Sequence, residues 1–222
     1  MNPLNSFDPF GLMVRLIGER WSLRVVRWTL VCLAGIFLAI RASEYEKFIS
    51  KPLWLAETLI FLVMAVAFVV RRNPVERSRG VKLIVVPILG GLLPFALLTT
   101  PPDMALLNNP ALRDALFMAM TLFTALTVWG LWWLRRAFSI TVEAREVVSG
   151  GPYRFIRHPV YLGELLTAAT VLMLRPSALN ILIYVLFFAI QLKRSKWEEQ
   201  ILIRNFPEYE ERMKGRFWFW RV

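Results

Sequence analysis

Two short stretches near the C-terminal end of the chain gather the side chains that could do chemistry. The first spans residues 145–164 and contains His158, the single histidine. The second spans residues 193–199 and contains Arg194 and the pair Glu198-Glu199. A carboxylate can bind ribose hydroxyls or an amino group, and a guanidinium can hold a carboxylate or phosphate through paired hydrogen bonds. Because such groups are costly beside apolar helices, they mark a candidate site.

The local sequence indicates how these residues are presented. Gly150-Gly151-Pro152 permits a sharp turn and a close approach of the backbone to a ligand. Pro159 suits the first turn of a helix, so His158 would be its N-terminal flank, where exposed N–H groups can receive polar ligand atoms. Arg194 and Glu198 are four residues apart and share one face if their helix continues that far.

The residue inventory also argues against some chemistry. The chain has one histidine and one cysteine, Cys32, whereas a metal site needs several ligands, so we predict no bound metal. Cys32 cannot form an internal disulfide, and its place in an apolar run predicts a small buried residue. No nucleophile has an evident base partner, so the sequence does not indicate a serine or cysteine hydrolase.

Composition sets the fold class. Of the 222 residues, 57% are hydrophobic, against roughly 45–50% in a typical soluble domain. The excess lies in long runs, which predicts an all-α fold, a polytopic helical bundle in a lipid bilayer. The net charge of +11 could suggest nucleic acid, but the basic residues flank the apolar runs, so we predict the bilayer as partner and no nucleic acid.

Six apolar segments are predicted. They comprise residues 25–40, 53–70, 81–99, 115–138, 160–174 and 178–192. A span needs roughly 20 residues, so the first, fifth and sixth segments are short unless flanking basic and aromatic residues anchor their ends. Arg175-Pro176-Ser177 is a three-residue break that predicts an antiparallel hairpin of the last two segments, and Pro87 and Pro94 predict a kink in the third.

We divide the chain into three parts. Residues 1–24 alternate apolar and charged side chains at roughly helical spacing, which predicts an amphipathic segment at the membrane interface or packed on the bundle. Residues 25–138 hold the first four spans. Residues 139–222 hold the candidate site, the hairpin and a basic tail. The hairpin would bring His158 close to Glu198-Glu199, and this convergence is the main structural prediction.

The basic residues predict the orientation. They gather in the loop 71–82, in the stretch 135–157 and in the tail 193–221, whereas the loop after the third segment has Arg113 alone. The positive-inside rule therefore places both termini and the candidate site in the cytoplasm. The first loop departs from this pattern, because it holds Arg41, Lys47 and Lys51 against Glu44 and Glu46.

The two polar stretches resemble a known family. Gly151-Pro152-Tyr153, then Arg157-His158-Pro159-Val160-Tyr161-Leu162-Gly163, and later Glu198-Glu199 and Phe206 are similar to the isoprenylcysteine carboxyl methyltransferases. The signature of that family is Arg-His-Pro-x-Tyr-x-Gly, followed by a glutamate pair after a helical hairpin. The resemblance covers roughly the C-terminal third of the chain.

The resemblance implies a membrane methyltransferase that uses S-adenosyl-L-methionine on a lipophilic or membrane-associated acceptor. Arg194 would be the catalytic residue that contacts this acceptor, and Glu199 would complete the glutamate pair. The cofactor-binding residues carried over by position are Arg145, Glu146, Val147, Val148, Tyr153, His158, Pro159, Val160, Tyr161, Glu198 and Glu199. A carboxylate acceptor needs no general base, whereas an amine or thiol would need one, with His158 or Tyr161 nearest.

Several alternatives stay open. The tail departs from the family, with Phe206-Pro207 in place of Phe-Gly and the ending Phe217-Trp218-Phe219-Trp220 in place of a proline-containing stretch, so the acceptor is not fixed. Phospholipid N-methylation and small-thiol S-methylation would use the same fold. An NADPH-dependent sterol or steroid reductase would explain Glu164 but not Val160, where those enzymes have asparagine. A non-enzymatic membrane scaffold is the last alternative, and the sequence does not predict the oligomeric state.

Overall fold

The computed structural model describes residues 12–77 and 81–221, in which nearly all regular structure is helical. The predicted amphipathic segment before residue 12, with Phe7 and Phe10, and positions 78–80 of the basic loop lie outside these residues. In chain order the elements are α1 Leu12–Ile17, α2 Glu19–Ser43, η1 Tyr45–Lys47, α3 Lys51–Val70, β1 Glu76–Arg77, α4 Lys82–Ala96, η2 Leu97–Thr99, α5 Met104–Asn108, α6 Pro110–Leu134, β2 Glu143–Ala144, η3 Gly151–Arg154, α7 Pro159–Leu174, α8 Ala178–Asn205 and α9 Tyr209–Met213.

Within the described ranges, five helices are long and apolar enough to cross a membrane, and α7 is a shorter apolar helix of 16 residues. The all-α polytopic fold is thereby confirmed. The first and sixth predicted segments belong to longer helices than expected, because α2 has 25 residues and α8 has 28. The fourth segment begins earlier and ends sooner than predicted: α6 starts at Pro110, where the Asn109 side chain accepts a hydrogen bond from the Leu112 backbone N–H.

Capping residues fix the turn between the last two helices. Ser177 precedes α8, and its side chain accepts a hydrogen bond from the Asn180 backbone N–H at 3.0 Å. Asn180 is fully buried and donates to the Arg175 carbonyl at 2.8 Å. The three-residue break therefore closes the antiparallel hairpin that the sequence predicts.

Small residues set how closely the helices of this region pack. A Cβ atom added to Gly163 of α7 would lie 2.3 Å from the Thr127 hydroxyl of α6, and one added to Gly130 would lie 2.8 Å from the Val160 side chain. On the other side of the hairpin, a Cβ atom at Gly90 of α4 would lie 2.9 Å from the Ile190 side chain of α8. The hairpin is therefore held tightly between α6 and α4, as expected for close helix packing in a membrane.

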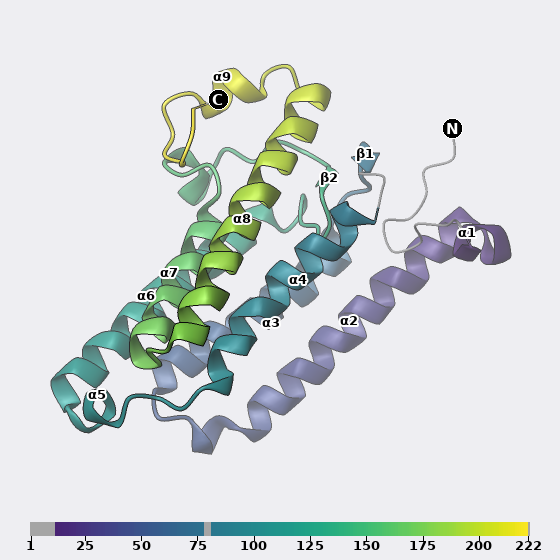
Figure 1. The fold of residues 1–222 in the computed structure, drawn as a ribbon. Coiled ribbons are helices and arrows are strands. Elements are labelled where there is room, and N and C mark those ends of the chain that lie inside the picture. The colour runs from purple at the N-terminus through teal and green to yellow at the C-terminus, as the bar shows by residue number, and fades with distance from the viewer. Residues whose placement is uncertain (1–11, 78–80, 222) are drawn as a thin grey trace.

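The connections separate into two ends of the bundle. The β1–β2 pair, in which Glu76 pairs with Ala144, lies at the same end as α9, and α5 lies at the opposite end (Figure 1). Which end faces the cytoplasm stays a prediction from the basic residues. At the far end Arg41 pairs with Glu57 at 2.7 Å, so one of the unexpected basic residues of the first loop is neutralised within the bundle.

Candidate active site

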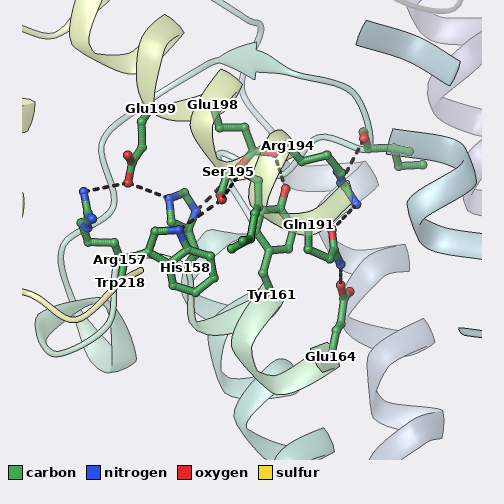
Figure 2. A network of polar contacts seen from close by, with 12 residues as sticks. Arg157, His158, Tyr161, Glu164, Gln191, Arg194, Ser195, Glu198, Glu199 and Trp218 are labelled. Atoms are coloured by element: carbon green, nitrogen blue, oxygen red, sulfur yellow. Dashed lines mark hydrogen bonds and ion pairs between the residues drawn. The ribbon is translucent and has the colours of Figure 1, made fainter. Parts of the chain in front are cut away.

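The two polar stretches meet where α7 begins and α8 approaches its end (Figure 2). His158 precedes α7, and its Nε2 atom lies 2.9 Å from Oε1 of Glu199. Because a carboxylate only accepts, this nitrogen carries the proton. One helical turn further along α7, the Tyr161 hydroxyl donates to Glu198. The predicted convergence of the histidine turn with the glutamate pair is confirmed.

Glu199 is fully engaged by protein groups. Its Oε1 atom lies 2.9 Å from Arg157 as well as from His158, and its Oε2 atom accepts a hydrogen bond from the Trp220 indole at 2.6 Å. The side chains of Arg157 and Glu199 are 1% and 5% exposed, so this ion pair is shielded from water. Glu199 thus joins the turn before α7, the helix α8 and the tail.

Glu198 has a different environment. One oxygen accepts from Tyr161, and the other lies 4.0 Å from Nδ1 of His158, beyond hydrogen-bond distance. The side chain is 23% exposed, against 5% for Glu199. Of the two acids, Glu198 is therefore the one that can offer an oxygen to a ligand.

Arg194 lies one turn earlier on α8 and begins a second polar chain. It donates to the Gln191 side chain at 3.2 Å and to the Ile140 carbonyl at 3.4 Å. Gln191 in turn donates to Glu164 of α7, and the guanidinium lies 4.9 Å from the centre of the Tyr161 ring. Arg194 is 7% exposed, and its buried Nε atom has no hydrogen-bond partner among the described residues. The arginine is therefore only partly satisfied by the protein.

The aromatic tail closes one side of the site. A short parallel bridge between Ile156 and Phe217 brings the tail beside the turn that precedes α7. The Trp218 indole donates to the Ser195 hydroxyl at 3.2 Å and lies 4.8 Å from the His158 ring, centre to centre. This ending departs from the family signature, and its tryptophans contact the site directly.

The predicted cofactor loop lies beside the β1–β2 pair. The buried Arg145 pairs with Glu143 and donates to the Arg72 carbonyl, and Glu146 pairs with the Arg72 side chain at 2.8 Å. Val147 and Val148 line an open cavity of about 360 Å³. The remaining lining residues are Trp133, Arg135, Arg136, Glu146, Ser149 and Gly150. Four consecutive residues of the predicted set, 145–148, therefore lie together at this loop.

The glycine turn is confirmed, but its close neighbour is a side chain of α6. Gly151 has φ of 56°, and a Cβ atom there would lie 2.2 Å from the indole nitrogen of Trp133. The turn leads into η3, where Tyr153 is buried, and burial raises the pKa of the Tyr153 hydroxyl, which stays protonated. Pro159 and Val160 are buried against α6 at Gly130, so their side chains serve packing.

Sequence reasoning missed part of the network. Gln191 stands three residues before Arg194, and Ser195 stands three before Glu198, so a polar face on α8 could have been predicted from helical spacing. The sequence pattern marks Glu164 only as a match to the reductase motif. The local sequence does not predict the contacts of Trp218 and Trp220, because these contacts depend on how the tail folds back onto the helices.

Comparison with known proteins defines the class. The family model described as phospholipid methyltransferase matches residues 113–209, from the first turns of α6 to the start of α9. With its apolar helices, the protein is a multi-pass membrane protein and a methyltransferase. The matched family is related to the isoprenylcysteine carboxyl methyltransferases, but that particular resemblance is not confirmed. No curated protein and no solved structure matches the chain.

Proposed function

We propose that the protein transfers a methyl group from S-adenosyl-L-methionine to a lipophilic acceptor, at the end of the bundle where His158, Tyr161 and Glu198 meet. The observation that supports this most is the junction of the two motif halves, with His158 2.9 Å from Glu199 and Tyr161 bonded to Glu198. A scaffold would not need a carboxylate with an unbonded oxygen and a partly satisfied arginine beside such a junction, since poorly solvated polar groups are costly.

The residues present fit the methyl donor. Among the described residues one oxygen of Glu198 has no hydrogen-bond partner, and this oxygen would accept from the donor's amino group or ribose hydroxyls. Tyr161 fixes the other oxygen and so orients the carboxylate. When bound, the donor supplies a methyl group already activated by its sulfonium. The remaining proposed contacts are Arg145, Glu146, Val147, Val148, Tyr153, His158, Pro159 and Val160, with Glu199 holding His158 in place.

Arg194 is proposed to contact the acceptor. It lies on the same face of α8 as Glu198 but one turn further from the end of the helix, and its Nε atom is buried without a partner among the described residues. The donor would enter from the cytoplasm and the acceptor from the bilayer, so the two would meet between Glu198 and Arg194. Trp218, which contacts Ser195 and His158, would shield the two reactants from water on one side.

Calorimetry on the detergent-purified protein tests the proposal. We expect S-adenosylhomocysteine to bind and NADPH not to bind, and Glu198→Ala to abolish binding of S-adenosylhomocysteine. Asp114→Asn is the matched control, because Asp114 is an exposed acid paired only with its neighbour Arg113 in the described chain. Binding of NADPH alone would instead support a reductase, binding of neither a scaffold, and normal affinity in Glu198→Ala would refute the assignment of the glutamate.

A further inference from the structure

The cavity at the end of α6 carries a positive charge that the proposed donor contacts do not explain. Arg135 and Arg136 follow directly after α6, and both line this cavity of about 360 Å³, a size at which proteins bind small ligands or headgroups. Its one acidic lining residue, Glu146, is already paired with Arg72 at 2.8 Å. Within residues 12–77 and 81–221, neither lining arginine has a carboxylate partner, so the cavity favours an anion.

Both guanidinium groups keep hydrogen-bond donors for a ligand. Arg136 is exposed, and its side chain has no hydrogen bond or ion pair within the described part of the chain. Arg135 donates through one nitrogen to the Trp132 carbonyl at 2.6 Å and lies over the Trp132 ring, which leaves other N–H groups of its five. Two neighbouring arginines with free donors are suited to the oxygens of a phosphate group.

The position of the cavity along α6 indicates where such a ligand comes from. The helix has 25 residues and is therefore about 37 Å long, which exceeds a hydrocarbon core of roughly 30 Å. The two arginines beyond its last residue thus reach the headgroup region of the bilayer. Trp132 and Trp133 at the same end are 47% and 43% exposed, as is typical of tryptophan at this depth.

The walls of the cavity are partly apolar. Gly150 and Gly151 pack directly on Trp133, since a Cβ atom on either would lie 2.3 Å or less from the indole. Val147 and Val148 add aliphatic surface to the lining. A free inorganic anion has no use for such walls, whereas a lipid has apolar groups next to its phosphate. The combination therefore fits a lipid headgroup, like the basic pockets that hold acidic lipids beside other membrane helices.

The cavity is separate from the proposed place of methyl transfer. None of its lining residues is among the labelled side chains of the network in Figure 2. A lipid held there would not be the methyl acceptor, which is proposed to meet Arg194. The cavity does share Glu146, Val147 and Val148 with the proposed donor contacts, so an experiment has to distinguish a lipid from the donor.

We propose that the Arg135–Arg136 cavity binds the phosphate group of an acidic membrane lipid. Arg136 and Arg135 hold the phosphate oxygens, and Val147 and Val148 face the glycerol end of the chains. The donor contacts residues 145–148 from outside the cavity, so that lipid and donor bind together. This lipid site does not depend on the proposed methyl transfer.

Native mass spectrometry of the full chain in detergent tests the proposal. The probes are phosphatidylglycerol, which is acidic and carries no amine, phosphatidylcholine with the same chains, and inorganic phosphate. The variants are Arg136→Gln and Arg136→Lys, which should leave the fold intact because the side chain has no polar partner among the described residues. Arg154→Gln is the matched control, because Arg154 is an exposed arginine outside the cavity lining.

We expect the wild type to retain phosphatidylglycerol in preference to phosphatidylcholine, and inorganic phosphate at the same concentration not to displace it. Arg136→Gln should lower the affinity for phosphatidylglycerol about tenfold, as for loss of a hydrogen bond to a charged group. Arg136→Lys should recover only part of it, because an ammonium does not bind phosphate oxygens in pairs. Arg154→Gln should bind like the wild type.

Four results would overturn the inference. They are equal retention of the two lipids, displacement of the lipid by inorganic phosphate, wild-type affinity in Arg136→Gln, and an equal loss in Arg154→Gln. Displacement of phosphatidylglycerol by saturating S-adenosylhomocysteine would also overturn it, because the cavity would then belong to the donor. Absence of S-adenosylhomocysteine binding alone would count against the proposed function and leave the lipid site standing.

Discussion

Two helical hairpins of this protein hold charged side chains between their helices, and they do so in different ways. The α2–α3 hairpin contains Arg41 and Glu57, one charge of each sign, 2.7 Å apart. Trp54 completes this contact, because its indole donates to the Arg41 carbonyl while the arginine donates to the Trp54 carbonyl. At the site on the α7–α8 hairpin, the acids Glu164, Glu198 and Glu199 lie near the guanidinium groups of Arg157 and Arg194. Both Glu164 and Glu198 keep an oxygen without a hydrogen bond in the described chain.

A charged side chain held between helices is therefore not by itself a site. Arg41 and Glu57 cancel each other and link neighbouring helices, which is a structural role. In the α7–α8 hairpin the Arg157–Glu199 pair plays the same role, but Arg194, Glu198 and Glu164 remain unbalanced next to it. Unbalanced charge with free hydrogen-bonding capacity is what indicates a ligand, because folding alone would select against it.

The largest effect should come from breaking the Arg157–Glu199 ion pair beside the α7–α8 hairpin. Glu199→Ala leaves Arg157 and His158 buried without their acceptor and should cost about 3–5 kcal/mol of unfolding free energy. Unfolding of the detergent-solubilised protein by denaturant measures this. Glu210→Ala, at an exposed position of α9, is the control and should change little. Equal stability of the two variants would contradict the structural role of Glu199.

Replacement of Arg194 should have a smaller effect, and we expect this effect on turnover. Arg194→Ala should lower turnover about 100-fold, typical of losing one positioned donor, while the affinity for S-adenosylhomocysteine is retained. Arg194→Lys should not restore the rate, since an ammonium cannot reproduce the planar guanidinium. Loss of both turnover and donor affinity would show that Arg194 serves the donor and not the acceptor.

Apolar residues should be able to replace the Arg41–Glu57 ion pair of the α2–α3 hairpin. Glu57→Ala alone should cost about 1–2 kcal/mol, less than the usual figure for a buried pair, because the Glu57 side chain is 30% exposed. The double change Arg41→Met with Glu57→Leu should restore stability and leave methyl transfer unchanged. A large loss of activity in the double variant would mean that the α2–α3 hairpin contributes to the site.

The smallest effect should come from the tail. Trp220→Phe keeps an aromatic ring but removes the indole donor to Glu199, which should cost about 1 kcal/mol. Thermal unfolding in detergent detects this change. A matched substitution, Trp132→Phe, affects an exposed tryptophan at the end of α6 and should be neutral. If Trp220→Phe were equally neutral, the tail would not be anchored through Glu199.

The sequence alone determined the membrane class, the helical fold, the hairpin and the meeting of His158 with the glutamate pair. Each follows from a local cause: apolar length, a proline–serine break, and helix geometry that carries polar residues to one end. The sequence could not show which partners Glu198 and Glu199 have. Neighbouring residues on a helix point in different directions, but the sequence does not show what lies in each direction. Only the tertiary structure decided this, because Glu199 is contacted by Arg157 from the turn before α7 and by Trp220 from the tail, and both are distant from it in sequence.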